Sequence, residues 1–392
     1  MIFLGCLISD NEKQEVYQNS KKEISEAASN FQNLLIEGFA EHGVHVNLIN
    51  ALPVGSFPKH YKKIFLKHKS NFYKGIEYSE EVASINLPLL KQYSRYRSVL
   101  KLLKRYKTSQ DIIIYSSNLF YLKALSKLKV KHNVTAIITD LPEYWNLSKT
   151  NTFLYKLQVK LMYKYLKNVD KFVFLTSHMA EKINVGERKY IVIEGLVDNK
   201  IEHIKNDVNY NSKKYAIMYS GTLHEKFGIK KLVDAVMMIQ DSNIELLICG
   251  SGEMSTYIKK MHEIDSRINY LGQIPRSEVL ALQRKVNLLV NPRPNEGEYV
   301  KYSFPSKTME YMLSGTPVLM YRLDGVPDEY SNYLFYVEGN DVEDLKNAIL
   351  KIKNMKQVDV VKKGQDAIDF VISQKNNLVQ TKKIIDLIKI RE

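Results

Sequence analysis

The chain has 392 residues, of which 45% are hydrophobic and 26% are charged, a composition that excludes a disordered or fibrous protein. Only two cysteines occur, which excludes a disulfide framework and a cysteine-rich zinc module. The net charge of +14 is concentrated in residues 1–205, with 31 basic and 19 acidic residues, and there mainly in residues 51–167, with 22 and 6. This excess predicts an anionic partner: a membrane surface, a phosphorylated acceptor or nucleic acid.

The apolar run at residues 2–8 is too short for a membrane-spanning helix and has no basic region before it. We therefore interpret it as a first buried strand and not as a signal peptide. No later apolar run reaches the roughly 18 residues that a spanning helix needs. These features predict a cytoplasmic protein, and the length allows two domains of ordinary size.

Apolar runs alternate with amphipathic segments along the first half of the chain. A helix is expected over residues 24–42, and others over residues 119–128 and 153–166. Short runs rich in branched residues predict strands at residues 2–8, 44–49, 111–115, 134–138, 172–175 and 190–193. Such alternation is typical of a parallel, doubly wound sheet.

The polar, unpatterned segment around residues 198–214 is the best linker candidate. The same alternation resumes after it, and the chain is helical from about residue 342. Strands are expected at residues 215–219, 245–249, 268–271, 286–290 and 318–320. We therefore expect an α/β protein with an N-terminal domain over residues 1–198, a linker over 199–213, a C-terminal domain over 214–375 and a final helix within 376–392.

The stretch over residues 291–319 combines a strand end, a polar loop and a helix start. Two prolines end the strand, since proline cannot donate to a sheet ladder. Pro305 suits the start of a helix, where its missing N–H costs nothing. The amides of Ser306, Lys307 and Thr308 would then be free at the helix N-terminus and form an anion site.

Charged residues surround this helix start. Lys307 adds a positive charge beside the amides, and Arg293 approaches from the end of the preceding strand. Glu310 lies three residues after Lys307, on the same side and one turn deeper. A cation with free amides suits phosphates and a carboxylate suits ribose hydroxyls, so the set suits a nucleotide. From spacing alone, a surface Lys–Glu ion pair is the commoner interpretation.

The motif SFPSKTMEYMLSGTPVL resembles the donor-site signature of the retaining glycosyltransferases of family four, which have two Rossmann-like domains in the GT-B fold. The resemblance extends over nearly the whole chain and is most specific over residues 214–330. It implies two Rossmann-like, doubly wound domains. It also implies that the C-terminal helix crosses back to the N-terminal domain.

In that family two glutamates lie eight positions apart at this motif, and the second, which binds the donor ribose, matches Glu310. The first, which faces the donor sugar, would fall at Tyr302, so this sequence departs from the pattern. Glu296 and Glu298 are the nearest carboxylates that could substitute. Of these, Glu298 is our candidate for the catalytic, sugar-facing role.

The resemblance also points to the turn after the first strand of the second domain. Family members commonly place an arginine after a glycine there and a lysine five residues later, and both bind the donor phosphates. Here the glycine is Gly221, the next residue is Thr222, and Lys226 lies one place early. Phosphate binding is therefore expected to pass to Arg293 and Lys307. A plain strand–turn–helix explains Gly221 alone equally well.

Two further turns lie at the carboxyl ends of predicted strands, where such sheets bind ligands. Gly250 ends one strand and opens a helix, so its amide faces this edge. Gly272 and Gln273 belong to a turn that resembles the family's base-binding turn, in which backbone groups hold the nucleobase. Both turns are therefore expected to contribute to the donor site.

In the first domain, Asp140 follows a predicted buried strand. Many relatives have a His-Asp pair near this place, bordering the acceptor site, but Thr139 replaces the histidine here and only Asp140 matches. A carboxylate at a strand end can accept the proton of an acceptor hydroxyl, which makes Asp140 a catalytic candidate. A cap for the turn before Pro142 is at least as good an interpretation.

The resemblance implies transfer, with retention, of a hexosyl or N-acetylhexosaminyl group from a nucleotide sugar to a hydroxyl of a glycan or lipid-linked acceptor. Family practice indicates bacterial capsule or exopolysaccharide assembly. The histidines show no paired metal spacing, so we expect no metal and no cofactor beyond the nucleotide-sugar co-substrate. Two alternatives stay open: a nucleotide-sugar 2-epimerase on the same scaffold, and a non-catalytic partner subunit.

Residues 59–74 and 95–107 interleave basic residues with apolar and aromatic ones. Each Lys or Arg near an anionic leaflet contributes on the order of 1 kcal/mol, so these stretches predict peripheral contact with the inner face of the cell membrane. A solvated basic face on ordinary helices is the alternative. Nucleic acid is disfavoured because no recognition module accompanies the charge.

Overall fold

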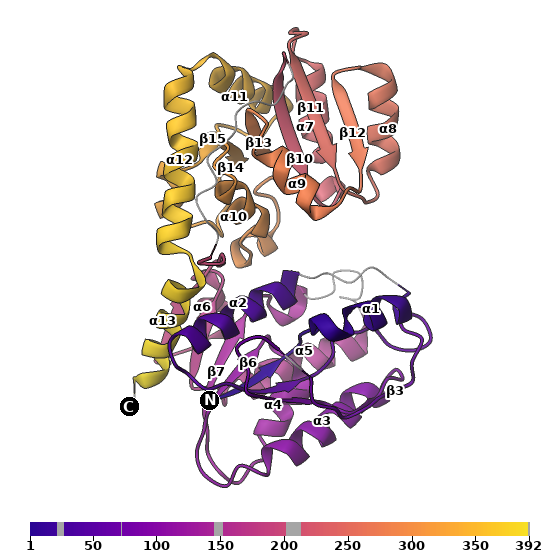
Figure 1. The fold of residues 1–392 in the computed structure, drawn as a ribbon, viewed down its shortest axis with the longest axis vertical. Coiled ribbons are helices and arrows are strands. Elements are labelled where there is room, and N and C mark those ends of the chain that lie inside the picture. Colours follow the sequence, from indigo (N-terminus) through magenta and orange to yellow (C-terminus); the bar gives the residue numbers. More distant parts are fainter. Residues whose placement is uncertain (22–26, 72, 145–151, 201–212, 391–392) are drawn as a thin grey trace. The chain divides into compact units, whose positions relative to one another are not determined.

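The computed structural model describes residues 1–21, 27–71, 73–144, 152–200 and 213–390 (Figure 1). The chain divides into an N-terminal unit, Met1–Asp198 with Asn376–Glu392, and a C-terminal unit, Asn199–Lys375. Each unit contains one large parallel sheet, so the predicted α/β class is confirmed. Residues 201–212, most of the predicted linker, lie outside the described residues.

The N-terminal unit is built on a seven-stranded sheet with the order β4-β2-β1-β6-β7-β8-β9. All of its strand pairs are parallel. The order reverses between β1 and β6, which are neighbours. The strands are β1 (Ile2–Gly5), β2 (Asn47–Asn50), β4 (Tyr78–Glu81), β6 (Asp111–Tyr115), β7 (Asn133–Ile138), β8 (Lys171–Phe174) and β9 (Tyr190–Val192).

Helices pack around this sheet, which explains why its central strands are apolar on both faces. Buried side chains of β1, β6 and β7 share one core cluster with those of two helices, α2 and α13. The helices of the unit are α1 (Asp10–Asn19), α2 (Ala27–Glu41), α3 (Leu90–Leu103), α4 (Leu119–Leu125), α5 (Phe153–Leu166), α6 (His178–Ile183) and α13 (Asn377–Lys389), with a short η1 (Pro142–Tyr144).

Helix α13 belongs to the N-terminal unit although it follows the C-terminal unit in the chain. The Asn376 side chain caps it by accepting a hydrogen bond from the Val379 amide (2.9 Å). Its contact with α2 is close: a Cβ at Gly38 would lie 2.6 Å from Oγ1 of Thr381. Lys171 donates to the carbonyl of Ile388 (2.9 Å), which ties the helix to β8.

The elements of this unit that were not expected from the sequence include helices α1, α3 and α6, strand β4 and the antiparallel pair β3 (Phe65–Leu66) and β5 (Ser84–Ile85). Strand β4 reads YSEE, which no hydrophobic pattern identifies as a buried strand. Its Glu81 is buried and accepts hydrogen bonds from the hydroxyl of Tyr73 (2.6 Å) and from Asn50 (2.9 Å). Specific polar partners, and not apolar side chains, stabilise this strand.

The C-terminal unit contains a six-stranded sheet with the order β12-β11-β10-β13-β14-β15. All of its strand pairs are parallel. The last strand was not predicted from the sequence. The strands are β10 (Tyr215–Ser220), β11 (Ile244–Cys249), β12 (Ile268–Gly272), β13 (Leu288–Asn291), β14 (Val318–Tyr321) and β15 (Phe335–Val337).

Helices flank this second sheet as well, and Figure 1 shows α8 beside β12 at one edge. They are α7 (Ile229–Met237), α8 (Ser255–Ile264), α9 (Arg276–Gln283), α10 (Ser306–Leu313), α11 (Val342–Asn354) and α12 (Gln357–Gln374), with the short η3 (Glu225–Phe227), η4 (Glu298–Tyr302) and η5 (Asp328–Asn332). In the described ranges, no helix is both long enough and apolar enough to cross a bilayer.

Candidate functional site

The strand order of the C-terminal sheet reverses between β10 and β13. Parallel α/β sheets bind ligands at their carboxyl edge, beside such a reversal, because the loops there diverge. The loops after β10 and β11 approach each other closely at this edge. A Cβ at Gly250 would lie 1.8 Å from the carbonyl oxygen of Gly221, so a residue larger than glycine would force the two loops apart.

Lys307, in the first turn of α10, extends over the backbone of Gly221. A Cβ at residue 221 would lie 2.0 Å from its Cε and 2.7 Å from its Nζ. Partial burial lowers the pKa of Lys307, and the nearby carboxylate of Glu310 opposes this effect. The ammonium group therefore lies at the strand-order reversal, on the glycine turn singled out by the sequence.

The amides at the start of α10 differ from one another. Thr308 is buried and its amide donates to the carbonyl of Pro305 (2.9 Å), so the expectation that this amide is free is wrong. Its hydroxyl accepts from Asn291 (3.3 Å), which ties the helix to the end of β13. Within the described residues the amides of Ser306 and Lys307 make no backbone hydrogen bond. These two amides remain available to an anion.

Glu310 is held by two neighbours that the sequence did not indicate. Gln283, fully buried at the end of α9, donates to Oε1 of Glu310 (2.9 Å) and to the hydroxyl of Ser220 (2.9 Å). Arg276, at the start of α9, pairs with Oε2 (3.1 Å). The carboxylate pairs with Arg276 and not with Lys307 among the ion pairs of the described chain, so the surface Lys–Glu pair that spacing favours does not form there. Nothing in the local sequence marks Gln283, because a buried amide at a helix end leaves no pattern.

Helix α10 is fixed against β10 by a buried tyrosine. The hydroxyl of Tyr311 accepts from the Ser220 amide (2.9 Å) and donates to the Ser220 carbonyl (3.0 Å). Direct, buried polar contacts of this kind define a single geometry. They set the position of Glu310, the residue before Tyr311, relative to the end of β10.

Arg293, two residues after β13, is 8% exposed and its guanidinium donates to the hydroxyl of Ser303 (2.7 Å). It also lies over the ring of Tyr299, 5.0 Å from the centroid. Burial lowers the pKa of Arg293. Its Nε has no hydrogen-bond partner in the described part of the chain. The side chain therefore orders the loop over residues 292–303 and retains one unsatisfied donor.

The predicted sugar-facing carboxylate, Glu298, is exposed at the start of η4. The hydroxyl of Tyr302 donates to its Oε1 (3.0 Å). Tyr302 stands where the family pattern places a glutamate. Tyr302 thus holds Glu298, the carboxylate that we expect to take the role of the missing glutamate.

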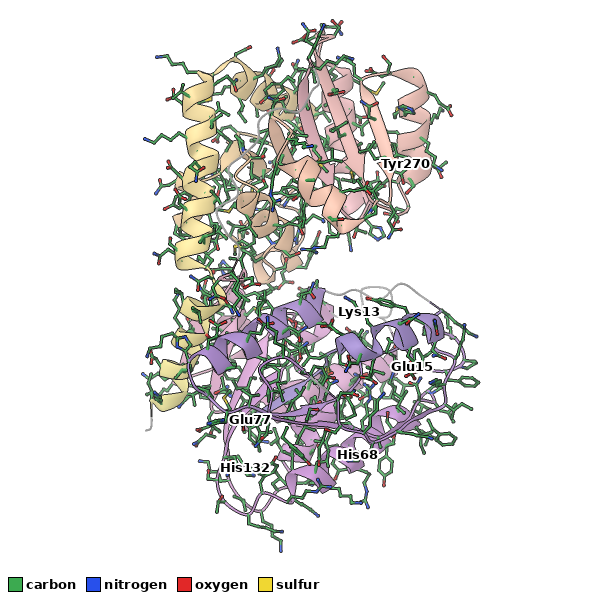
Figure 2. All side chains as sticks on the ribbon, viewed as in Figure 1. Lys13, Glu15, His68, Glu77, His132 and Tyr270 are labelled. Carbon is green, nitrogen blue, oxygen red and sulfur yellow. The ribbon has the colours of Figure 1, made fainter. Side chains whose placement is uncertain are left out.

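The remaining predicted residues of this unit lie on the loops at the same sheet edge. Thr222 is exposed, and Lys226 extends over the ring of Phe227, 5.1 Å from its centroid. Gly272 has a φ of 66°, in the left-handed region that favours glycine, and Gln273 is exposed after it. The hydroxyl of Tyr270, labelled on β12 in Figure 2, donates to the carbonyl of Gly250 (3.0 Å) and joins two of these loops.

Asp140 belongs to the N-terminal unit, where it is exposed after β7 at the carboxyl edge of that sheet. Trp145, the only tryptophan of the same segment, lies outside the described residues. Within the ranges that the structure describes, no group of three or more His, Cys, Asp or Glu side chains could hold a metal ion. Catalysis without a metal stays a prediction.

Parts of this chain are similar in sequence to known proteins. Residues 200–369 match a family model described as "Glycosyl transferases group 1". A D-inositol 3-phosphate glycosyltransferase of Corynebacterium glutamicum is 28% identical over 33% of this chain and 32% of its own, so the chain spans about a third of that relative. The O-antigen chain mannosyltransferase RfbU of Salmonella typhimurium is 24% identical over 57% of this chain and 62% of its own.

Among solved structures, HepE of Anabaena in complex with UDP is similar to this chain, with a TM-score of 0.63 and 12% identity over 98% of each chain. At this identity the likeness shows the fold alone. The chain therefore has the two-unit α/β architecture of the GT-B fold, and its residues 200–369 are similar in sequence to the group 1 glycosyl transferases.

Proposed function

We propose that this chain is a retaining glycosyltransferase that moves a hexosyl or N-acetylhexosaminyl group from a nucleotide sugar to a hydroxyl of a glycan or lipid-linked acceptor. One observation carries the proposal. Lys307 and Glu310 extend from one turn of α10 to the strand-order reversal, the first over Gly221 and the second beside Gln283. A cation and a carboxylate one turn apart fit the phosphates and the ribose of one nucleotide.

In this proposal the donor diphosphate binds at the start of α10. The ammonium group of Lys307 and the amides of Ser306 and Lys307 face the phosphates, and the helix dipole adds to their field. The same groups stabilise the negative charge that develops on the nucleotide as the glycosidic bond breaks. Transfer then needs no metal ion, because groups of the protein stabilise the negative charge of the leaving nucleotide.

Glu310 accepts hydrogen bonds from the ribose hydroxyls in this arrangement. Gln283 orients the carboxylate through Oε1, while Oε2 is paired with Arg276, whose side chain is 71% exposed. An exposed ion pair of this kind contributes only about 0–1 kcal/mol, so a ribose can displace the guanidinium at little cost. Arg276 thus covers the ribose position without blocking it.

Glu298 and Asp140 are the proposed catalytic carboxylates. The hydrogen bond from Tyr302 gives Glu298 a defined orientation on its loop, which supports a role facing the donor sugar. Asp140, exposed at the end of β7, is placed to accept the proton of an acceptor hydroxyl. We propose retention because the family resemblance implies it.

Assembly of a cell-surface polysaccharide is the proposed biological role. The similarity to the O-antigen chain mannosyltransferase of Salmonella typhimurium supports it, because that protein's name describes work on a surface glycan. The basic N-terminal half, with 31 basic and 19 acidic residues over residues 1–205, suits an acceptor held at an anionic membrane.

An exposed apolar face of the N-terminal unit supports peripheral membrane contact. We define it as five exposed side chains on β3, β5 and the start of α3: Phe65, Ile85, Leu89, Leu90 and Tyr93. Phe65 pairs with Ile85 across the two strands, and the Ile85 amide donates to Ser94 of α3 (3.0 Å). Arg95, within the predicted basic stretch, is instead buried and donates to the carbonyl of Leu52 (2.6 Å).

The test is a thermal-shift panel of nucleotides and nucleotide sugars, followed by a donor-hydrolysis assay. A ligand that binds only the folded chain raises the melting temperature by mass action, so selective stabilisation by one nucleotide names the donor class. Slow hydrolysis of the matching nucleotide sugar supports the transferase. Formation of an epimer would identify a 2-epimerase, and absence of both binding and turnover would identify a partner subunit; either result overturns the proposal.

A further inference from the structure

A cavity of about 240 Å³ opens at the carboxyl edge of the N-terminal sheet, beside its edge strand β4, and we call it the β4 cavity. Its lining comes from α1, from the residues after β2, from the segment around β3 and from the end of β4. Strands β2, β1 and β6 separate β4 from β7, which precedes Asp140, and four strand spacings of about 4.8 Å make roughly 19 Å. A group bound in this cavity is therefore not the group that reacts beside Asp140.

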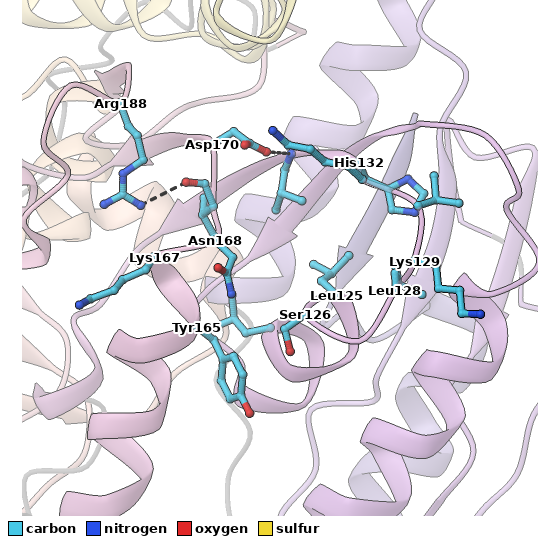
Figure 3. Close-up of a pocket in the computed structure, with 15 residues that line it drawn as sticks. Leu125, Ser126, Leu128, Lys129, His132, Tyr165, Lys167, Asn168, Asp170 and Arg188 are labelled. Atoms are coloured by element: carbon cyan, nitrogen blue, oxygen red, sulfur yellow. Dashed lines mark hydrogen bonds between the residues drawn. The ribbon is translucent and has the colours of Figure 1, made fainter.

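A larger cavity, of about 480 Å³, lies at the amino edge of the same sheet (Figure 3). Lys129 and Lys167, which line it, carry their ammonium groups away from one another in that view. Its labelled lysines therefore do not converge on one point, and exposed lysines alone do not make a binding site. We assign a ligand only to the β4 cavity.

Apolar side chains form much of the wall of the β4 cavity. Val16 of α1, Leu52 after β2, Leu66 of β3 and Val82 after β4 line it. Sites for small molecules combine mostly apolar walls with a small number of polar groups that fix the orientation of the ligand. The β4 cavity therefore suits a small organic group and not a bare ion.

Charged side chains also line the β4 cavity, and their signs balance. Three glutamates and three lysines belong to the described lining. Glu12, whose side chain is 7% exposed, pairs with Lys69, and Glu15, labelled on α1 in Figure 2, pairs with Lys63. Paired charges leave little net potential, so this lining favours an uncharged ligand. The carboxylate oxygens remain acceptors for hydroxyl groups of such a ligand.

A buried tyrosine supplies a second, independent feature of the β4 cavity. Tyr61 lines the cavity, is 1% exposed and packs in a small core cluster with Val16. Among the described residues its hydroxyl has no hydrogen-bond partner, and protein atoms do not enclose it as they enclose the hydroxyl of Tyr215. Burial raises the pKa of Tyr61 to about 12, and the charges of Glu15 and Glu12 add to this effect, so both carboxylates lie near the hydroxyl. The protonated hydroxyl can donate and accept hydrogen bonds in the cavity.

We propose that the β4 cavity binds one uncharged sugar residue of the glycan acceptor, away from the residue that receives the transferred group. A sugar is a small, uncharged ring that carries hydroxyl groups beside CH groups, the combination that this lining fits. The Tyr61 hydroxyl and the carboxylate of Glu15 bond its hydroxyls, and the apolar wall contacts its CH groups. The inference rests on the proposed function only where it names this sugar as part of the acceptor, and it makes that acceptor an oligosaccharide.

The first test follows the tyrosine rings of the full chain by NMR after selective labelling, with Tyr61→Phe to assign the Tyr61 signal. D-Glucose, D-galactose, D-mannose and N-acetyl-D-glucosamine are the probes, each without any nucleotide. We expect at least one of these sugars to shift the Tyr61 signal and to saturate, while glycerol at equal concentration leaves it in place. Absence of a saturable shift with all four sugars, or an equal shift with glycerol, would overturn the proposal.

The second test compares two variants with the same chemical changes. The cavity variant carries Tyr61→Phe and Glu15→Gln, and the control carries Tyr78→Phe and Glu77→Gln, at exposed residues of the same unit that do not line the cavity. Saturation transfer to the protons of the sugar measures binding without the Tyr61 signal. We expect the apparent Kd to rise at least about fivefold in the cavity variant, since two hydrogen-bonding groups change, and to stay within about twofold in the control. Equal losses in both variants would contradict a site.

Methyl glycosides distinguish a residue of a glycan from a free sugar. A residue within an oligosaccharide carries a substituent at its anomeric oxygen, so a glycan site must accept the methyl α- or β-glycoside of the sugar that binds. We expect at least one of the two to bind as tightly as the free sugar, within about twofold. Failure of both to bind would show a site that encloses a free sugar, and would overturn the role in acceptor binding.

Nucleotide binding separates this inference from the proposed function. The cavity variant should keep the thermal shift that the matching nucleotide gives in wild type, because none of its changes lies in the C-terminal unit. A sugar-dependent Tyr61 shift without any nucleotide binding would overturn the proposed transferase and leave the sugar site in place. Nucleotide binding without a sugar-dependent shift would overturn the sugar site alone.

Discussion

The ammonium group of Lys307 reaches the end of β10 because residue 221 has no side chain. A Cβ at residue 221 would lie 2.0 Å from Cε of Lys307. Gly221→Ala should therefore displace the lysine and weaken binding of a nucleoside diphosphate about tenfold, since a charge-assisted bond to phosphate contributes roughly 1.5–3 kcal/mol. Binding of the nucleoside should hardly change. Titration calorimetry with both ligands measures the two effects.

The melting temperature is the control for Gly221→Ala. The atoms that a new Cβ would meet belong to the flexible end of Lys307, but Gly221 has a φ of 157°, at which a side chain strains the backbone. The melting temperature should therefore fall by a few degrees without loss of the fold. A Gly221→Ala/Lys307→Ala double variant should bind no more weakly than Lys307→Ala alone. Additive losses would show that the alanine distorts the loop independently of the lysine.

Glu310 is the residue whose ligand contact we predict most sharply. Its carboxylate is oriented by Gln283 and covered by the exposed Arg276. Glu310→Ala should lower transfer at least about 100-fold, which corresponds to roughly 2.7 kcal/mol, because a methyl group cannot accept from the ribose hydroxyls. Wild type should prefer the normal nucleotide over its 2′,3′-dideoxyribose version, and the variant should hardly discriminate. Full preference in the variant would assign Glu310 a structural role.

Glu81 predicts a pH dependence of stability. Burial and, to a smaller degree, the negative charge of Glu12 raise the pKa of its carboxyl, and the hydrogen bonds that Tyr73 and Asn50 donate lower it in part. The resulting pKa is about 7. The folded state thus holds a proton that the unfolded state releases above its ordinary pKa of 4.5. The associated stability is full below pH 4.5 and is lost as the pH rises to about 7, by about 3–4 kcal/mol.

Glu81→Gln isolates this effect because glutamine does not ionise. The free energy of unfolding of the variant, relative to wild type, should increase by that amount between pH 4.5 and pH 7. Denaturant unfolding of both proteins at several pH values measures the difference. Parallel pH profiles would mean that Glu81 ionises in the folded state as it does in the unfolded one.

At the scale of the element, helices α2 and α13 pack so closely at Gly38 that a side chain there would clash. An added Cβ at Gly38 would lie 2.6 Å from Oγ1 and 2.8 Å from Cγ2 of Thr381, in a buried helix contact. Gly38→Ala should therefore destabilise the N-terminal unit by about 1–3 kcal/mol through overpacking, measured by denaturant unfolding. Thr381→Ala in the same chain should recover part of this loss, and a failure to recover it would place the strain elsewhere.

Strands buried on both faces could be predicted from the sequence, because a parallel sheet covered by helices requires continuous apolar runs. β6, β7, β10 and β11 are of this kind. Strand β4 could not, because its burial depends on hydrogen bonds from Asn50 and Tyr73, which are distant in the chain. Hydrophobic periodicity carries no information about such partners.

The sequence predicted part of the candidate site and missed the residues that only the fold brings together. Gly221, Lys307 and Glu310 lie in short local motifs, and the resemblance to the glycosyltransferase family, not the spacing alone, made them donor-site candidates. Gln283 and Arg276 lie in no such motif, since they act through a helix that only the fold brings beside α10. The expectation that the Thr308 amide is free was wrong, because this amide donates a hydrogen bond to the carbonyl of Pro305 in the first turn of α10.

At the scale of the whole molecule, the proposed membrane contact can be tested on the apolar face of the N-terminal unit. Phe65, Leu89 and Tyr93 are 65%, 80% and 57% exposed. Replacing all three by serine should weaken binding to phosphatidylglycerol vesicles at least about tenfold, since each buried apolar side chain contributes about 1.5–3 kcal/mol. Co-sedimentation at low and high salt measures this.

A matched control for the apolar face replaces exposed apolar residues of the C-terminal unit: Ile264→Ser, Val358→Ser and Val361→Ser. This control should bind vesicles as wild type does. An equal loss in both variants, or binding that salt leaves unchanged, would contradict membrane contact through the apolar face and the basic residues near it.

The position of α13 has a consequence for synthesis on the ribosome. Ile384 and Leu387 complete the core cluster that contains Phe39 and Leu48, so the first unit to emerge lacks part of its interior until the last helix is made. The C-terminal unit is continuous over Asn199–Lys375 and has no such delay. We therefore expect nascent chains held on the ribosome with only residues 1–375 extruded to show a protease-resistant C-terminal unit and a sensitive N-terminal one. Extrusion to residue 390 should protect both.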